Sequence, residues 1–107
     1  MTNLKTEATD EGTYIITCTF TDSDGSAVTP NSVTWSLTDF DGTTINSRTD
    51  VSATPDTSVS IALSGDDLNY NDGIGRIFSI VGTYDSAVYG AGLPIREQAR
   101  FTIGQWT

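Results

Sequence analysis

Two short segments carry the residues that are best suited to binding a metal ion. Residues 22–25 and 39–42 share the pattern Asp-x-Asp-Gly. Alternate carboxylates before a glycine also open the calcium loop of helix-loop-helix proteins, but neither segment has the glutamate that such a loop carries at its twelfth position. Asp and Gly are equally what tight turns require, so we expect two turns and no metal site. Calcium would be favoured if both turns met Asp66 and Asp67 at one end of the fold.

The residues needed for catalysis are largely missing. The chain has no histidine, which removes the Ser-His and Cys-His pairs that activate nucleophiles. With 14 acidic residues, the chain has enough carboxylates for the catalytic pair of a glycosidase. These acids cluster at turns, however, so we do not expect two of them to form such a pair. Gly73-Ile-Gly75 lacks the strand before it and the helix after it that a phosphate-binding loop needs. We therefore expect no enzymatic activity and no cofactor.

Cys18 is the single cysteine, so it cannot form a disulfide within the chain. It stands at the centre of an alternating run, and Trp35 stands at the centre of the next. A cysteine on one strand and a tryptophan on the following strand are typical of an immunoglobulin-like sandwich, here without the second cysteine. An inward cysteine of this kind behaves as a small apolar residue rather than as a reactive thiol. A free thiol also agrees with folding in a reducing cytoplasm.

Alternation of apolar and polar residues predicts the strands that carry these side chains. The pattern is clear over residues 14–21, 32–39, 58–63, 76–84 and 96–103, and weaker over 4–8 and 43–48. We expect 43–48 to be an edge strand on which Arg48 discourages pairing with other chains. About seven short strands separated by turns predict an all-β fold, an immunoglobulin-like antiparallel sandwich that forms a single domain over residues 1–107.

The inward positions of these strands define the predicted core. Phe78 or Ile80 is expected to face Cys18 in place of the missing cysteine. Ser64 is expected to cap a single helical turn, and Leu68 to plug one end of the sandwich. The structural core is predicted to contain Cys18, Trp35, Phe78, Ile80 and Phe101.

One segment is the main candidate for contact with a partner. Residues 84–93 join the last two predicted strands and carry Tyr84, Tyr89 and Leu93 among small residues. Sandwich domains often place recognition in such loops, where tyrosine adds contact area at low entropic cost. The alternative is a hairpin whose aromatic side chains fold back on the sandwich. Trp106 near the C-terminus has the same two interpretations, an anchor on a partner or a lid on the sandwich.

The charge of the chain limits its partners. A net charge of −9 at pH 7 argues against nucleic acid and against an anionic membrane surface, because both attract clustered Lys and Arg. Apolar stretches of two or three residues, such as Ile15-Ile16, are too short to cross a bilayer. The residues after Met1 include no apolar run, so we expect no secretory signal.

Three stretches of the chain resemble a known group of proteins. They are TYIITCTFTDSDGSAVTPNSVTWSLTDFDGTTINSR, VSIALSGDDL and LPIREQARFTIGQW, and together they cover most of the chain. They resemble small immunoglobulin-like proteins encoded among the virion assembly genes of tailed bacteriophages and prophages. The pattern DxDGxxVTPxSVTWxLxD is also similar to single repeats of bacterial surface proteins.

The resemblance implies a non-enzymatic structural or accessory protein of the virion, assembled in the host cytoplasm. It would be a capsid decoration or cement protein, or an accessory subunit of the head-tail joint or tail. Its partners would be the major capsid protein or head-tail and tail subunits, and association between copies of the chain stays open. The alternative is an adhesive or carbohydrate-binding module of a bacterial surface protein, in which Tyr84, Tyr89 and Trp106 would stack on sugars. The lack of an export signal favours the virion.

Overall fold

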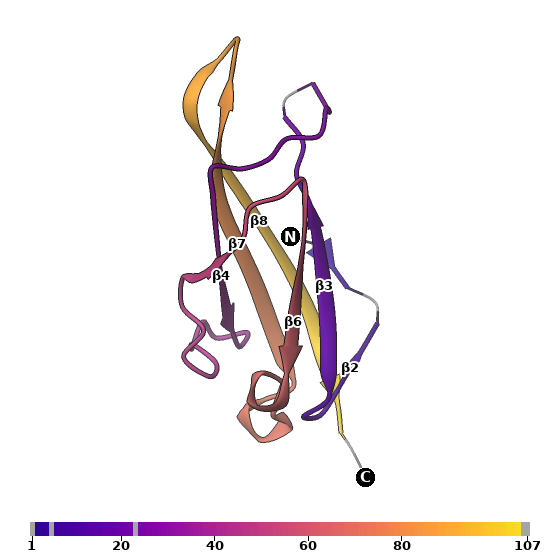
Figure 1. The fold of residues 1–107 in the computed structure, drawn as a ribbon. Coiled ribbons are helices and arrows are strands. Elements are labelled where there is room, and N and C mark those ends of the chain that lie inside the picture. Colours follow the sequence, from indigo (N-terminus) through magenta and orange to yellow (C-terminus); the bar gives the residue numbers. More distant parts are fainter. Residues whose placement is uncertain (1, 5, 23, 106–107) are drawn as a thin grey trace.

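The computed structural model describes residues 2–4, 6–22 and 24–105, most of which lie in strands (Figure 1). Two short 3-10 helices, η1 (Gly65–Leu68) and η2 (Tyr70–Asp72), precede β7. No helix in these ranges is long and apolar enough to cross a membrane. The strands in chain order are β1 (Thr2–Asn3), β2 (Ala8–Thr9), β3 (Thr13–Thr19), β4 (Ser32–Thr38), β5 (Val51–Ala53), β6 (Ser58–Ser64), β7 (Gly75–Ser86) and β8 (Gly90–Gly104).

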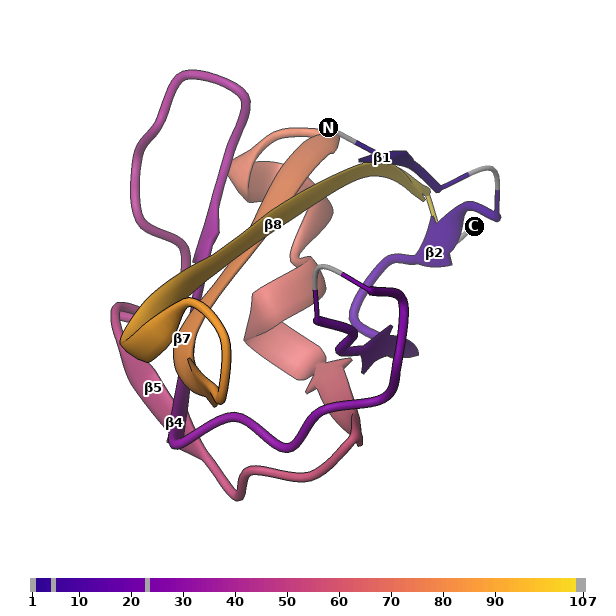
Figure 2. The same ribbon diagram turned by 90° about the horizontal axis from the view of Figure 1, so that it is seen from above.

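The strands form a curled six-stranded sheet and a separate two-stranded sheet, with the core between them (Figure 2). The large sheet has the order β1-β8-β7-β4-β5, and β2 also pairs with β8. The small sheet consists of β3 and β6. The predicted all-β character is confirmed. The expectation of purely antiparallel pairing is wrong at one edge, because the N-terminal segment runs in the same direction as β8 and pairs with it in parallel.

The two weaker predicted strands are not formed as expected. Residues 4–8 are not one strand, because β1 ends at Asn3 and β2 begins at Ala8. Residues 43–48 form no edge strand. Asn46 and Ser47 adopt positive φ angles of 52° and 56°, which turn the backbone away from an extended path. This bend leaves Ile45 buried and brings the half-exposed Arg48 to the buried Asp67.

The core consists of side chains from both sheets. Trp35 on β4 packs against Phe78 on β7, with ring centroids 5.6 Å apart. Tyr14 on β3 stacks on Phe101 on β8, with centroids 4.5 Å apart. Trp35, Phe78, Ile80 and Phe101 are buried, whereas Cys18 is half-buried and packs against the edge of the core.

A fully buried arginine stabilises the end of the fold where η1 and η2 lie, which is the lower end in Figure 1. Arginine side chains are usually exposed to water, but that of Arg76 on β7 is fully buried. It donates four hydrogen bonds to backbone carbonyls. Its Nε donates to the carbonyl of Asp67 at 3.0 Å, and its Nη2 to that of Asn69 at 2.8 Å. Its Nη1 donates to the carbonyls of Gly73 and Gly75, both at 2.8 Å. These bonds fix η1 and η2 against the start of β7.

Burial lowers the pKa of Arg76, because the charged form loses contact with water. The negative charges of Asp72, Asp39 and Asp67 act in the opposite direction. The guanidinium has no carboxylate within the ion-pair distance in the described part of the chain, so carbonyl dipoles provide its close contacts.

Asp67 is the second buried charge at this end. Its carboxylate accepts hydrogen bonds from Arg48 Nε at 2.8 Å, from Asn46 Nδ2 at 2.9 Å and from the backbone N–H of Ser64 at 3.1 Å. Ser64 is the N-cap of η1, and Leu68 is fully buried beneath it, as the sequence predicts. Arg48 was expected to discourage pairing at an exposed edge. It instead closes an ion pair with Asp67 and lies 5.5 Å from the centroid of the Trp35 ring.

The pKa of Asp67 predicts a dependence of stability on pH. Burial alone would raise this pKa, but the hydrogen bonds from Arg48, Asn46 and Ser64 outweigh it and lower the pKa. A carboxyl whose pKa is lowered by folding stabilises the protein fully above its unfolded pKa of about 3.9. That stabilisation is lost as the pH falls through the folded pKa.

We therefore expect the free energy of unfolding to fall below about pH 4, and to fall less steeply in Asp67→Asn than in the wild type. Asp66→Asn is the matched control, because Asp66 is the exposed neighbour of Asp67 on η1. Urea unfolding between pH 2.5 and 7 measures the slopes. Equal slopes for Asp67→Asn and the wild type would contradict the role of this carboxylate.

Replacing Trp35 with alanine tests the packing between the sheets. The indole is buried against Phe78 and beneath Arg48, so its removal leaves a cavity. We expect a loss of about 3–5 kcal/mol of unfolding free energy, as for other buried aromatic residues. Ile15→Ala, on the exposed face of β3, should cost much less. Similar losses for the two variants in chemical denaturation would show that Trp35 has no special place in the core.

Candidate functional site

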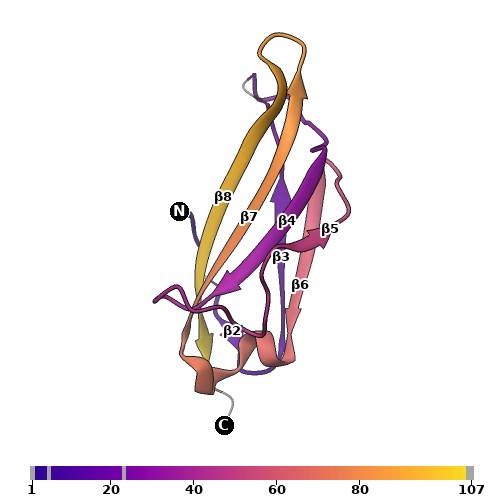
Figure 3. The same ribbon diagram turned by 90° about the vertical axis from the view of Figure 1, so that its left-hand side faces the viewer.

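The hairpin of β7 and β8 extends beyond the rest of the large sheet. β4 pairs with β7 only as far as Thr83, whereas β7 and β8 remain paired through Tyr84 with Leu93 to Ser86 with Gly90. Residues 84–93 therefore form a two-stranded projection, here called the arm, which rises past the end of β4 (Figure 3). The molecule is correspondingly long, with extents of 52 × 23 × 22 Å.

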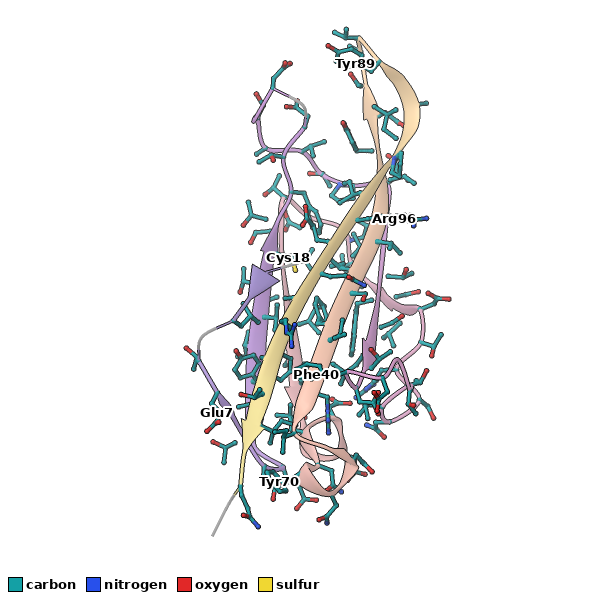
Figure 4. The ribbon with its side chains drawn as sticks, turned by 180° about the vertical axis from the view of Figure 1, so that it is seen from behind. Glu7, Cys18, Phe40, Tyr70, Tyr89 and Arg96 are labelled. Atoms are coloured by element: carbon teal, nitrogen blue, oxygen red, sulfur yellow. The ribbon has the colours of Figure 1, made fainter. Side chains whose placement is uncertain are left out.

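The tip of the arm presents apolar side chains to solvent. Ala87, Val88 and Tyr89 form the turn, and the Ser86 hydroxyl accepts the backbone N–H of Val88 and of Tyr89, each at 3.1 Å. Val88 is 76% exposed and Tyr89 65% exposed, and Figure 4 shows Tyr89 at the far end of the molecule. A valine and a tyrosine held outward in an ordered turn are a preformed apolar contact surface.

Asp85 ties the arm to the body of the protein. Its Oδ1 accepts the backbone N–H of Gly92 at 2.9 Å and the side-chain N–H of Asn31 at 3.0 Å. The bond from Gly92 and then that from Asn31 lower the pKa of this carboxyl. The backbone N–H of Asn31 also donates to the carbonyl of Thr83 at 2.6 Å. The segment before β4 thus holds the base of the arm from one side.

The structure separates the residues that the sequence groups as contact candidates. Tyr84 and Leu93 are half-buried and pair in register across the arm. Tyr89 alone of the three stands at the tip. The prediction that 84–93 is a loop is wrong for most of its length, because only residues 87–89 lie outside the two strands. Trp106 lies outside the described residues.

A second exposed patch lies on the outer face of the large sheet. Phe40 is 43% exposed, and the Arg100 guanidinium lies 4.5 Å from the centroid of its ring. Val81 is 39% exposed and pairs in register with Arg96 on the same face. Figure 4 shows Arg96 higher and Phe40 lower on this side of the molecule. In a chain with 14 acidic and 5 basic residues, this face is unusual in carrying two arginines.

The two Asp-x-Asp-Gly segments are turns. Asp22 Oδ1 accepts the backbone N–H of Asp24 at 2.9 Å, and Asp39 Oδ1 accepts that of Asp41 at 2.9 Å. Gly25 and Gly42 adopt φ angles of 82° and 91°, which favour glycine. The turns follow β3 and β4, which end at opposite ends of the molecule, so they do not meet near η1 (Figure 1). No group of three or more potential metal ligands occurs within residues 2–4, 6–22 and 24–105.

The buried charges Arg76 and Asp67 were missed by the sequence analysis. A signal for Arg76 was present, because it shares the inward parity of Phe78 and Ile80 on β7. Asp67 follows Ser64 by three positions, which is the spacing of a capping box. Both residues organise the lower end of the fold, and every one of their buried polar atoms has a hydrogen-bond partner.

Comparisons with known proteins give no independent guide to function. A scan against known protein families found no match, and searches of curated proteins and of solved structures found none either.

Proposed function

We propose that this chain is a non-enzymatic structural or accessory protein of a tailed-phage virion, which binds another virion protein through the tip of the arm. The observation that carries the proposal is the ordered projection of Val88 and Tyr89 beyond the sheets. The partner would be the major capsid protein or a head-tail or tail subunit. The resemblance of the sequence to virion immunoglobulin-like proteins is the reason for proposing a place in the virion, and the arm is the proposed binding surface.

An immunoglobulin-like architecture is part of this proposal. The pairing of β3 with β6 corresponds to strands B and E of such a sandwich. The order β4-β7-β8 corresponds to strands C, F and G, with β5 added beside C. Trp35 lies on the strand that corresponds to C, where antibody domains carry their buried tryptophan. Phe78 and Ile80 lie on the F-like strand, where the second cysteine of a disulfide would stand.

The arm suits attachment to a repeating shell. Its ladder and the Asp85 bonds are already formed, so little conformational entropy is lost when the tip binds. The tip is small, and the affinity of a single contact would be modest. Many copies on a symmetric particle turn a modest single-site affinity into stable attachment.

The carbohydrate-binding alternative has less support. Stacking on sugars requires exposed aromatic faces that lie together. Tyr84 is half-buried at the base of the arm, whereas Tyr89 stands at its tip. Trp106 lies outside the described residues, so of the three aromatic residues in this alternative only Tyr89 is shown to be exposed, and one tyrosine is a weak platform for a sugar.

Particle incorporation of arm variants tests the proposal. Particles are purified from cells in which the genome encoding this chain produces virions, and the chain is quantified in them by mass spectrometry. We expect the wild type at a fixed number of copies for each particle, and the double variant Val88→Ser with Tyr89→Ala in the soluble fraction. Removal of two exposed side chains should leave the melting temperature within a few degrees of the wild type.

Ile15→Ser is the matched control, because Ile15 is also exposed, at 64%, but lies on β3. It should be incorporated like the wild type. A wild-type chain that stays wholly outside purified particles would contradict a virion function. Full incorporation of the arm double variant would contradict the role of the arm. Binding of the isolated protein to a glycan array, lost with Tyr89→Ala, would favour the adhesive alternative.

A further inference from the structure

A groove runs between the two sheets on the side of the molecule where β3 and β8 face each other. Its upper part is a cavity of about 240 Å³ between these strands. A second hollow of about 450 Å³ continues it along β3 and shares Leu4, Ile16 and Thr17 with the first. Figure 4 shows Cys18 in the gap between the two strands. The apolar lining of the upper part comprises Leu4, Ile16, Cys18, Phe20, Phe78, Ile80 and Ala99.

The edge of β8 above this groove has no partner strand in the described part of the chain. β1 pairs with β8 only from Ala99 onward, and β2 pairs with it further along. The backbone N–H of Leu4 donates to the carbonyl of Arg100, so the backbone of Arg100 faces the outer edge. Because the direction alternates along a strand, the backbone groups of Gln98 and Arg96 face the same edge. The register of β1 uses the Gln98 carbonyl, and Pro94, the next residue on this edge, has no N–H. In the described part of the chain, the Gln98 N–H, both backbone groups of Arg96 and the Pro94 carbonyl are therefore left available for another strand.

The opposite wall of the groove is also an open edge. β3 pairs with β6 on one side, and none of the described strands pairs with its other side. The backbone N–H of Phe20 donates to Thr57, on the β6 side, so the backbone groups of Thr19 and Thr17 face the groove by the same alternation. Two unpaired edges therefore border one apolar slot. A peptide backbone, with a donor and an acceptor at every second residue, satisfies such edges better than a compact small molecule does.

Glu97 decides which kind of strand fits. It pairs in register with the inward-facing Ile80 and so has the inward parity of β8, and its exposed side chain lies at the mouth of the groove. Cys18 and Glu97 line the same cavity. Burial raises the pKa of the Cys18 thiol, and the negative charge of Glu97 raises it further. An inward charge at a strand edge repels an acidic strand, and it disfavours a neutral one because the carboxylate would be covered without a partner. A strand with a basic residue beside Glu97 would neutralise it.

We infer that this groove accepts an extended segment of a partner protein, which adds to β8 as a parallel strand above β1. The segment carries apolar residues at alternate positions and a lysine or arginine beside Glu97. The charge of the whole chain, −9, favours the same basic partner. The site is separate from the arm and does not depend on what the arm binds.

A donor strand fused to the chain tests the inference without a known partner. Continuing the register of Thr2 with Ala99 upward places the residue before Met1 beside Glu97. The probe is therefore an N-terminal extension, Thr-Val-Thr-Lys, which puts lysine at that position and valine beside Ile95, and which ends short of the arm. Fusion supplies a high effective concentration. We expect iodoacetamide to alkylate Cys18 about ten-fold more slowly, and the melting temperature to rise by about 5 °C.

Two matched extensions complete the test. One replaces the lysine with glutamate, and the other replaces the valine with proline, whose nitrogen faces β8 and cannot donate to the ladder. Both should leave Cys18 as reactive as it is in the unextended chain. Unchanged alkylation and melting with the lysine extension would overturn the inference. Equal protection by the lysine and glutamate extensions would overturn the requirement for a basic strand.

Discussion

The pairing of β7 with β8 is the constraint on which the rest of the structure depends. The ladder runs from Gly75 with Thr102 to Ser86 with Gly90, longer than any other in the fold. β4 attaches to one side of it, and β1 and β2 to the other. Phe78 and Ile80 project from its inner face into the core. The ladder extends beyond the end of the β4 pairing, and this extension is the arm. β1 pairs with β8 only from Ala99 onward, so the groove beside the preceding residues of β8 is left open.

The lower end of this ladder is fixed by charges that are buried. Arg76 is held by carbonyl oxygens from the η1–η2 segment, and Asp67 by donors from Ser64, Asn46 and Arg48. Burying either ion alone would cost several kcal/mol, and the cost is offset only because each has several hydrogen bonds in place. This arrangement gives the two ends different roles. The lower end is closed and polar inside, whereas the upper end carries exposed apolar residues on an ordered projection.

Alternation of residues predicted the strands that have one buried face. It located β3, β4 and β6 closely, since their inward residues, such as Ile16, Trp35 and Ile61, repeat with the period of a strand. It failed for the arm, because glycine and small residues in 84–93 resemble a loop and become strands only through the ladder that continues from the sheet. It also failed for 43–48, where positive φ angles at Asn46 and Ser47 override a weak pattern.

The candidate site was predictable only in part for a related reason. The sequence singled out Tyr89 correctly as a residue in the turn between the last two strands, but the positions of Tyr84 and Leu93 depend on register between strands. The groove depends on which edges remain unpaired, and no local pattern contains that information. The inward position of Arg76 could be predicted from the alternation along β7. Its hydrogen-bond acceptors could not, because these carbonyls belong to turns whose geometry depends on the whole fold.

Amide hydrogen exchange in the free protein is the most direct test of a preformed arm. If the ladder continues beyond β4, the amides of the Tyr84 and Leu93 pair exchange slowly, as those of Ile80 and Glu97 do within the sheet, while Ala87 in the exposed turn exchanges quickly. Exchange at Tyr84 and Leu93 as fast as at Ala87 would show that 84–93 is a loop, and would contradict the account.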